Sequence, residues 1–249
     1  MTEFREFEFA PKPDLLADQI VNRMATRFSQ PELQQIDIAR ILTGFNAVRV
    51  ATGKQMDALF FNYMRESALK SGKLSAGEIY ELLTTLPENG YGEFMSLDEI
   101  AGFTSHLKKE GYNVGLKFGH YRRLTLGHVF EFVYAGKGCD HMVLIIESGE
   151  RTSKFKNKRI ELSDEQRINM FKNSCLVQTL GITSGLDYSD TYYRDLVTEI
   201  KPTTLFIPDS WPENVQNEYK ERARLSGADP LVLPNLVPLT TTMMEKFIF

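Results

Sequence analysis

The chain is poor in cysteine, histidine and tryptophan. Its 249 residues include two cysteines, Cys139 and Cys175, four histidines and one tryptophan. The cysteines are not spaced as a metal-binding pair, so a reducing compartment is the simpler expectation. The histidines show no zinc spacing, and neither cysteine belongs to a recognisable nucleophile motif. Metal-dependent hydrolysis and nucleophilic triads are therefore poorly supported.

The chain also lacks a long apolar run and a basic balance. No segment approaches the roughly 20 consecutive apolar residues of a membrane span, and the first residues contain no apolar core of a signal peptide. The net charge of −4 and the pI of about 5.7 do not favour broad nucleic-acid affinity. We expect a cytoplasmic protein without a membrane or nucleic-acid partner.

The residues that are abundant describe an ordinary globular chain, with 42% hydrophobic residues, 25% charged residues and 17 phenylalanines. In residues 1–111, apolar side chains recur at helical spacing. They predict a helix that begins after Pro13 and stops near Gln30-Pro31, a second from Leu33 to an end at Gly44, and a third over about 54–71. Two capping-box spacings, Ser75 to Glu78 and Ser96 to Glu99, predict further helices over about 75–86 and 96–110.

No cluster of residues in this first part indicates chemistry. We interpret residues 1–111 as a helical N-terminal domain that packs on the rest of the chain or forms a homo-oligomer, because apolar helical stripes usually belong to a core. A small helix-turn-helix module is the alternative, since Leu97-Asp-Glu-Ile-Ala could open such a unit. The acidic balance of the chain argues against it.

Residues 112–249 alternate between short apolar runs and helical patterns. Strands are predicted over 114–118, 142–146, near 176–180, over 203–207 and over 231–233, and helices from Gly127, from Ser163, over 188–200 and over 215–225. Strands that alternate with helices favour parallel pairing through right-handed crossovers. The predicted fold class is α/β, with an open, mainly parallel five-stranded Rossmann-like sheet and a helical N-terminal domain.

A motif lies between the first of these strands and its helix. Residues 119–128 read Gly119-x-Tyr121-x-x-x-Thr125-x-Gly127-His128. Such a loop can bind phosphates, because the first N–H groups of the helix are unpaired and the helix dipole is positive there. The pattern is neither a Walker loop nor the three-glycine dinucleotide fingerprint. It resembles the G-x-F-x-P-x-(H/T)-x-G-H signature of the nucleotidyltransferase superfamily, which includes cytidylyltransferases and nicotinamide mononucleotide adenylyltransferases.

Two further stretches follow in the order of that superfamily. A basic segment after the second strand precedes the helix that carries Arg167, and the tail from Val237 to Glu245 resembles the segment (I/V)-S-(S/T)-(S/T)-x-I-R. The turn with Asp209 and Trp211 matches more loosely, and packing is the alternative role for Trp211. The resemblance covers residues 112–249, which we interpret as a nucleotidyltransferase-like domain.

The resemblance implies that a phosphate oxygen of a small phosphorylated substrate attacks the α-phosphate of ATP or CTP and releases pyrophosphate. Mg²⁺ would be carried mainly by the triphosphate. The implied catalytic residues are His128, Thr125 in place of a first histidine, and Arg167. The implied nucleotide- and phosphate-binding residues are Gly119, His120, Tyr121, Gly127, Lys156, Lys158, Asp209, Thr240, Thr241 and Thr242. A hydrogen-bonded structural role is the alternative for His120.

The sequence departs from the signature at two positions. Arg123 stands where the family has proline, and Glu245 stands where the tail segment has arginine. The second change reverses a charge near the expected polyphosphate. The rival interpretation is therefore a catalytically degenerate nucleotide-binding or assembly protein on the same fold.

Overall fold

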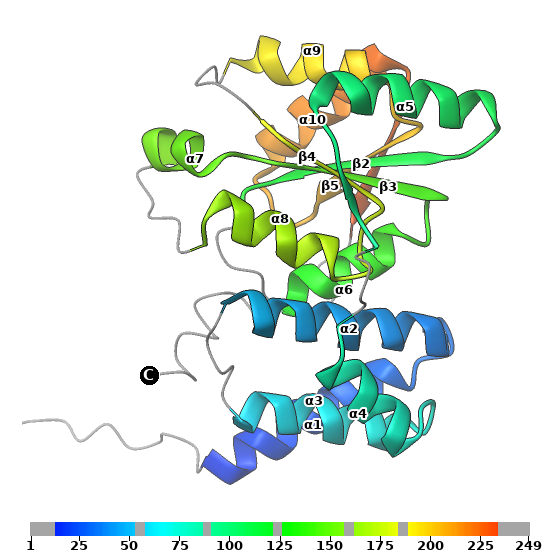
Figure 1. Ribbon diagram of the computed structural model, residues 1–249, viewed down its shortest axis with the longest axis vertical. Helices are drawn as coiled ribbons and strands as arrows, with labels where there is room; N and C mark the ends of the chain where they lie inside the picture. Colours follow the sequence, from blue (N-terminus) through cyan, green and yellow to red (C-terminus); the bar gives the residue numbers. More distant parts are fainter. Residues whose placement is uncertain are drawn as a thin grey trace, which may run out of the picture.

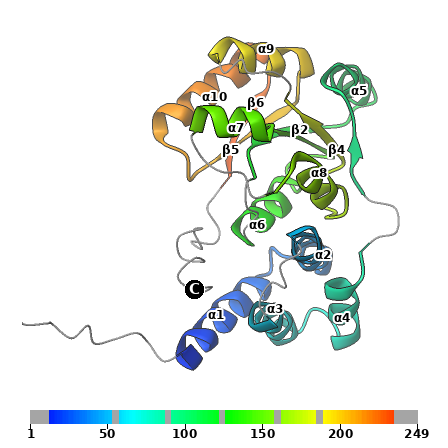
Figure 2. The same cartoon turned by 60° about the vertical axis from the view of Figure 1, so that its left-hand side comes forward.

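The residues described in the first part of the chain form four helices. A computed structural model describes residues 13–52, 58–86, 91–121, 126–156, 162–183 and 189–233 (Figure 1). The four helices are α1 (Pro13–Phe28), α2 (Gln35–Thr52), α3 (Ala58–Ser71) and α4 (Ala76–Thr84). Helix α1 packs on α3, and α2 packs on α4. Figure 2 shows α2 between the other three helices and the rest of the molecule.

Helix α2 is longer than the sequence predicts. The expected end at Gly44 is wrong, because α2 continues to Thr52. Gly44 instead allows a close approach of two segments, since a Cβ atom at this position would lie 3.1 Å from Cδ1 of Leu176. The glycine therefore marks a tight packing contact inside a helix and not its C-terminus.

The second part of the chain contains a parallel sheet. Its strands are β1 (Glu93–Phe94), β2 (Val114–Gly119), β3 (His141–Ile146), β4 (Thr179–Ile182), β5 (Thr204–Pro208) and β6 (Asp229–Leu233). Their order is β1-β4-β3-β2-β5-β6, and every pair of neighbours is parallel. The predicted open, Rossmann-like α/β fold is confirmed. Within the described residues the sheet has six strands and not the predicted five. The sequence does not reveal β1 because its two exposed residues carry no alternating pattern.

Helices cover both faces of the sheet. Figures 1 and 2 show α5 (Leu97–Lys109), α9 (Asp190–Ile200) and α10 (Glu213–Ser226) on one face, and α6 (Leu126–Ala135) and α8 (Asp164–Lys172) on the other. Helix α5, which the sequence places with the helical first part, packs against α9, β4 and β2. Its Ile100 is fully buried in the core on that face of the sheet.

One more helix, α7 (Gly149–Lys156), follows the carboxyl end of β3 (Figure 1). The sequence predicts only a loop with basic residues there, and that prediction is wrong. Helix α7 lacks an apolar stripe, and two of the side chains that it buries are those of Arg151 and Thr152. A hydrophobic pattern could not reveal a helix whose buried face is polar.

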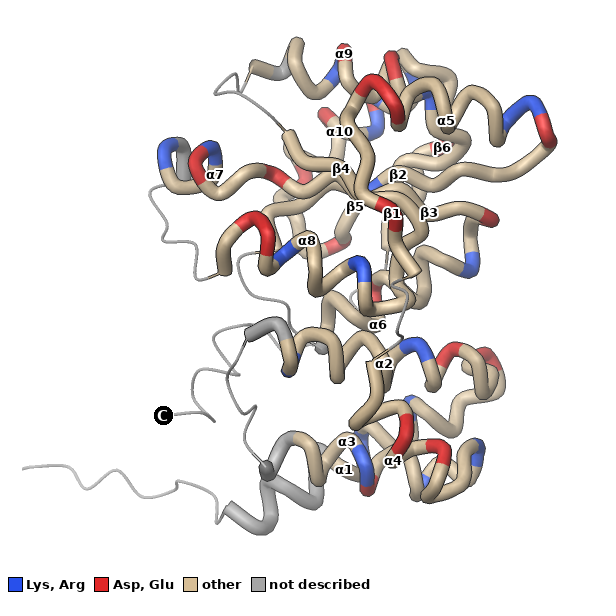
Figure 3. Tube along the Cα trace, in the orientation of Figure 1, with Lys and Arg blue, Asp and Glu red and all other residues tan. Residues whose placement is uncertain are grey.

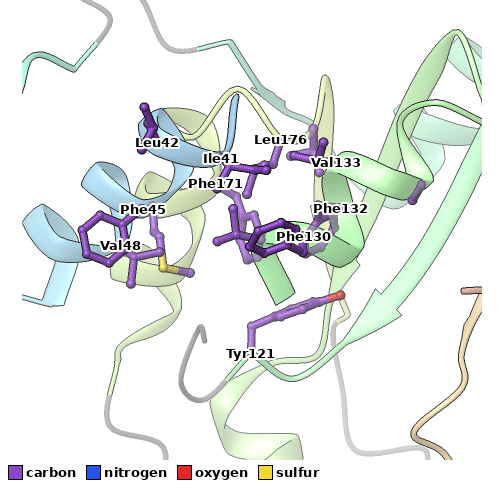
Figure 4. Close-up of a cluster of buried hydrophobic side chains, with 14 of the residues drawn as sticks. Ile41, Leu42, Phe45, Val48, Tyr121, Phe130, Phe132, Val133, Phe171 and Leu176 are labelled. Carbon is purple, nitrogen blue, oxygen red and sulfur yellow. The ribbon is translucent and has the colours of Figure 1, made fainter. Parts of the chain in front are cut away.

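The helical first part and the α/β part share one hydrophobic core. Figure 4 shows Ile41, Phe45 and Val48 of α2 facing the aromatic residues Phe130 and Phe132 of α6. Helix α2 packs on both α6 and α8. The side of the sheet that carries α6 and α8 is thus covered twice, first by these helices and then by α2.

The order of the strands creates a reversal point in the sheet. The chain passes from β2 to β3 to β4 through α6 and α8, then crosses to β5 on the other side of β2 through α9. The loops after β2 and β5 therefore lead to opposite faces. In open α/β sheets, ligands bind beyond the carboxyl ends of the strands at such a point.

Acidic and basic residues are interspersed over the described part (Figure 3).

Candidate active site at the reversal point

The motif predicted from the sequence lies beside the reversal point. Strand β2 ends at Gly119 and α6 begins at Leu126, so Gly127 and His128 are in the first turn of that helix. Strand β5 ends at Pro208, and Asp209 follows it as an exposed residue of a turn. The carboxyl ends of two neighbouring strands thus present some of the residues that the resemblance points to.

Tyr121 folds back over Gly119. Tyr121 has a φ of 45°, in the left-handed region that non-glycine residues rarely adopt. A Cβ atom at Gly119 would lie 2.5 Å from Cε2 of Tyr121, well inside van der Waals contact. The tyrosine ring also contacts Phe132 and Phe171, with centroid separations of 5.4 and 5.0 Å. The glycine and the aromatic residue of the motif therefore form one packing unit.

His128 lies at the edge of that unit. Its ring meets Tyr121 edge-on with centroids 5.6 Å apart. Burial lowers the pKa of His128 below its ordinary 6.5; the Glu131 carboxylate opposes this shift, and the Lys117 ammonium adds to it. The imidazole is therefore neutral at pH 7, and one of its ring nitrogens carries a proton that it can donate.

A buried ion pair lies close to His128. Lys117 points from β2 toward α6, its side chain is 1% exposed, and Nζ lies 2.9 Å from Oε1 of Glu131. Burial lowers the pKa of Lys117, and Glu131 opposes the shift. The ammonium also lies 5.7 Å from the centroid of the Phe132 ring. Burying a charged side chain in a central strand costs folding free energy unless an opposite charge pairs with it. Glu131 is that partner for Lys117.

Arg167 is fully buried and bonds the ends of two strands together. Its Nη1 donates to the carbonyl oxygens of His120, at 2.5 Å, and of Glu147, at 2.8 Å. Its Nη2 pairs with Asp164, whose Oδ1 also accepts the N–H of Gly149 at 2.8 Å. These contacts hold the loop after β2 against the start of α7. They make Arg167 a positioning residue, while the contact with nucleotide implied by the resemblance stays a prediction.

His120 follows directly after β2 and leans toward β3 and α7. Its Nδ1 lies 3.2 Å from Oε2 of Glu147 and 3.0 Å from Oγ1 of Thr152. About a fifth of the His120 side chain remains exposed, whereas the Glu147 side chain is 7% exposed. A histidine held by a carboxylate at the carboxyl edge of the sheet is a common arrangement for proton transfer.

Tyrosine and arginine side chains lie around the His120–Glu147 pair. Arg151 lies over the rings of Tyr192 and Tyr193, at 4.4 and 5.0 Å from their centroids, and Arg222 lies 4.3 Å from that of Tyr219. Trp211 packs edge-on against Tyr219 at 4.8 Å. This contact is the packing role that the sequence analysis weighed for Trp211.

The sequence did not identify Glu147, Thr152, Arg151 or Tyr193 as site residues. Glu147 carried a usable signal, because it is the first polar residue after a buried strand next to β2. Other predicted site residues lie outside the described part of the chain: Thr125, Lys158, Thr240, Thr241 and Thr242. Lys156 ends α7, but its side chain is also outside that part.

A separate cavity of about 70 Å³ lies at the opposite, amino-terminal edge of the sheet. Its lining includes Arg40 of α2 and both cysteines. Burial raises the pKa of Cys139 and of Cys175 to about 11, so both are thiols and weak nucleophiles at pH 7. Neither thiol is therefore activated as a nucleophile, and the cavity lies away from the carboxyl ends of β2 and β5, where the motif is found.

Two negative findings apply to the described residues. They contain no group of three or more His, Cys, Asp or Glu residues arranged to hold a metal ion. None of their helices combines the length and the apolarity that crossing a bilayer requires.

This chain is similar in structure to known proteins but matches no known family. No protein-family model and no curated protein matches this chain. Among solved structures, the chain is similar to the lipopolysaccharide core biosynthesis protein from Thermoplasma volcanium GSS1, with 17% identity and a TM-score of 0.39. The match covers 50% of this chain and 98% of that one. At this TM-score, the likeness adds nothing to the fold that the described strands and helices establish.

Proposed function

We propose that this protein is a nucleotidyltransferase that transfers a nucleoside monophosphate from ATP or CTP to a small phosphorylated metabolite and releases pyrophosphate. One observation carries the proposal: the segment from Gly119 to His128 leaves the carboxyl end of β2 at the reversal point of the sheet and opens α6. The N–H groups at the start of α6 suit a phosphate, and Gly127 allows its close approach.

In this proposal the reaction depends mostly on positioning and charge neutralisation, as in phosphoryl transfer generally. Neutral His128 donates a hydrogen bond to the phosphate on which negative charge develops. Mg²⁺ arrives with the triphosphate, since it is held mainly by phosphate oxygens and water. Thr125, Lys158 and the three threonines from Thr240 to Thr242 are proposed to bind the remaining oxygens.

Nucleotide binding is tested first. ATP and CTP, each with Mg²⁺, should raise the melting temperature of the protein. A ligand at a hundred times its dissociation constant stabilises the folded state by about 2.7 kcal/mol. No shift with either nucleotide would refute the proposal.

Catalysis is tested by pyrophosphate release with a panel of phosphate monoesters. His128→Ala should lower the turnover by a factor on the order of 10²–10³, as expected for the loss of one donor to a developing charge. The same substitution at His106, an exposed residue of α5, is the matched control and should leave turnover unchanged. Equal turnover of His128→Ala and the wild type would exclude the proposed role of His128.

The second candidate is a nucleotide-binding protein without catalysis. It is favoured by the inward hydrogen bonds of Arg167 and by the two departures from the family pattern, Arg123 for proline and Glu245 for arginine. Stabilisation by ATP or CTP without pyrophosphate release from any monoester in the panel would select this candidate.

A further inference from the structure

The hydrogen bonds around His120 decide which of its ring nitrogens carries the proton. Nδ1 has two neighbouring oxygens, Oε2 of Glu147 at 3.2 Å and Oγ1 of Thr152 at 3.0 Å. The Thr152 hydroxyl donates its single proton to the carbonyl oxygen of Ser148 at 3.0 Å. Toward His120, the hydroxyl can therefore act as an acceptor.

The other neighbour, Glu147, is also an acceptor. The hydroxyl of Tyr193 forms a hydrogen bond with its carboxylate, and burial, followed by the charge of Glu147, raises the pKa of Tyr193. The tyrosine thus keeps its proton and donates it. A carboxylate offers no proton in return, so the bond from Nδ1 of His120 requires an N–H group on that nitrogen.

The fixed proton on Nδ1 determines what Nε2 can do. In a neutral imidazole one nitrogen is a donor and the other is an acceptor. Nε2 of neutral His120 therefore holds a lone pair and cannot donate to a phosphate oxygen. Its chemistry is to accept a proton, which differs from the phosphate-binding role that the resemblance implies.

We infer that His120 is the general base of the site and that Glu147 and Thr152 are its positioning residues. The inference rests on the proposed nucleotidyltransferase function. The proton of the attacking O–H group moves to Nε2 while that oxygen bonds to the α-phosphorus and the bond to the pyrophosphate oxygen breaks. Pyrophosphate leaves, and the imidazolium then returns its proton to water. The acceptor class is an oxygen nucleophile that carries a proton, either a singly protonated phosphate or a hydroxyl.

Groups of α7, α8 and α9 lie around His120 and Glu147. Arg167 of α8 holds the carbonyl oxygens of both His120 and Glu147, so one buried side chain fixes the spacing of base and carboxylate. Arg151 of α7 lies over the ring of Tyr193, the α9 residue that bonds Glu147. The Glu147 carboxylate, which would stabilise the imidazolium, is therefore held by the hydrogen bond from Tyr193, and the guanidinium groups of Arg167 and Arg151 lie nearby.

The tautomer is tested without any nucleotide. Long-range ¹H–¹⁵N spectra of the histidine rings are recorded near pH 8, and the His120 signals are those missing from His120→Gln. The wild type should show a proton on Nδ1. Glu147→Gln together with Thr152→Val should remove this preference, because an amide can donate to Nδ1 and a valine cannot accept. A wild-type ring with its proton on Nε2 would overturn the inference and leave the proposed function intact.

The base role is tested by the rate of pyrophosphate release as a function of pH, with ATP or CTP and the active phosphate monoesters. His120→Gln should lower the rate by a factor on the order of 10²–10⁴, and His106→Gln should not. For a phosphate acceptor, the deficit of His120→Gln should shrink above about pH 7, since the second pKa of a phosphate monoester is about 6. For a hydroxyl acceptor, the deficit should persist at every pH.

The outcomes separate the two proposals. A His120→Gln rate equal to that of the wild type at all pH values would overturn the base role, even with the tautomer confirmed. Loss of ATP- or CTP-induced stabilisation in His120→Gln would assign His120 to nucleotide binding and also overturn it. A wild type with the Nδ1 proton that binds neither ATP nor CTP would refute the proposed function and with it the base role.

Discussion

Gly119→Ala tests whether the motif folds as described. The new methyl carbon would lie 2.5 Å from Cε2 and 2.6 Å from Cζ of Tyr121. Non-bonded carbons prefer about 3.5–4.0 Å, so the ring would have to move by about 1 Å or more. It cannot do so freely, because Tyr121 is 6% exposed and packs on Phe132, Phe171 and His128.

The expected cost is that of overpacking a filled core, about 1–3 kcal/mol of unfolding free energy. In a chain of this size each kilocalorie lowers the melting temperature by about 2–4 °C. Thermal and urea unfolding measure the change. The matched control is Gly102→Ala in α5, where a Cβ atom would have no neighbour within 4 Å. Alanine there should stabilise the protein by about 0.5–1 kcal/mol, because glycine is unfavourable inside a helix.

A second background decides whether Tyr121 is the cause. In Tyr121→Ala the ring is absent, so adding Gly119→Ala should cost almost nothing beyond the loss from Tyr121→Ala itself. An equal cost of Gly119→Ala in both backgrounds would refute the idea that Tyr121 folds over Gly119. The loop after β2 would then need another conformation.

Three further changes probe buried groups in the sheet and in the helices beside it. Lys117→Met leaves the Glu131 charge unpaired and should lower the free energy of unfolding in urea by about 3–5 kcal/mol. Lys117→Met/Glu131→Leu should recover most of this loss, and a double variant as unstable as Lys117→Met would contradict the reasoning. Arg167→Lys should lower the melting temperature far more than Arg194→Lys on the exposed face of α9, because an ammonium group cannot reach all the acceptors of the Arg167 guanidinium. Equal melting temperatures of the two variants would contradict a stabilising role for the hydrogen bonds of Arg167. Burial lowers the pKa of His141 below 6.5, so the unfolded chain binds this proton first as the pH falls. The contribution of neutral His141 to stability is complete above about pH 6.5 and is lost as the pH drops toward the pKa of His141 in the folded state. His141→Gln should therefore make the free energy of unfolding depend less on pH between pH 7 and 5. An unchanged pH dependence would contradict this role of His141.

Local signals predicted local structure well. The helix starts predicted at Ser75, Ser96 and Ser163 each carry a capping box, whose two partners lie within four residues of each other. The parallel sheet followed from the alternation of apolar runs and helical patterns. The placement of the motif between β2 and α6 followed from the strand pattern that ends at Gly119.

Features that depend on distant partners could not be predicted. Gly44 looks like a helix end until Leu176 is known to touch it. Arg167 looks like a surface residue of a polar helix, and its burial depends on carbonyl groups 20 and 47 residues earlier in the chain. The pairing of His120 with Glu147 depends on the neighbouring positions of β2 and β3, which the strand order decides.

The contact of α2 with α6 has a consequence for how this protein could be divided. The helix that carries His128 has its apolar side against α2, and Phe130, Phe132 and Val133 are almost completely buried (Figure 4). A fragment that begins after α4 would expose these side chains to water and would favour self-association. The first four helices contain no candidate catalytic residue, yet α2 covers the apolar side of α6, the helix that carries His128.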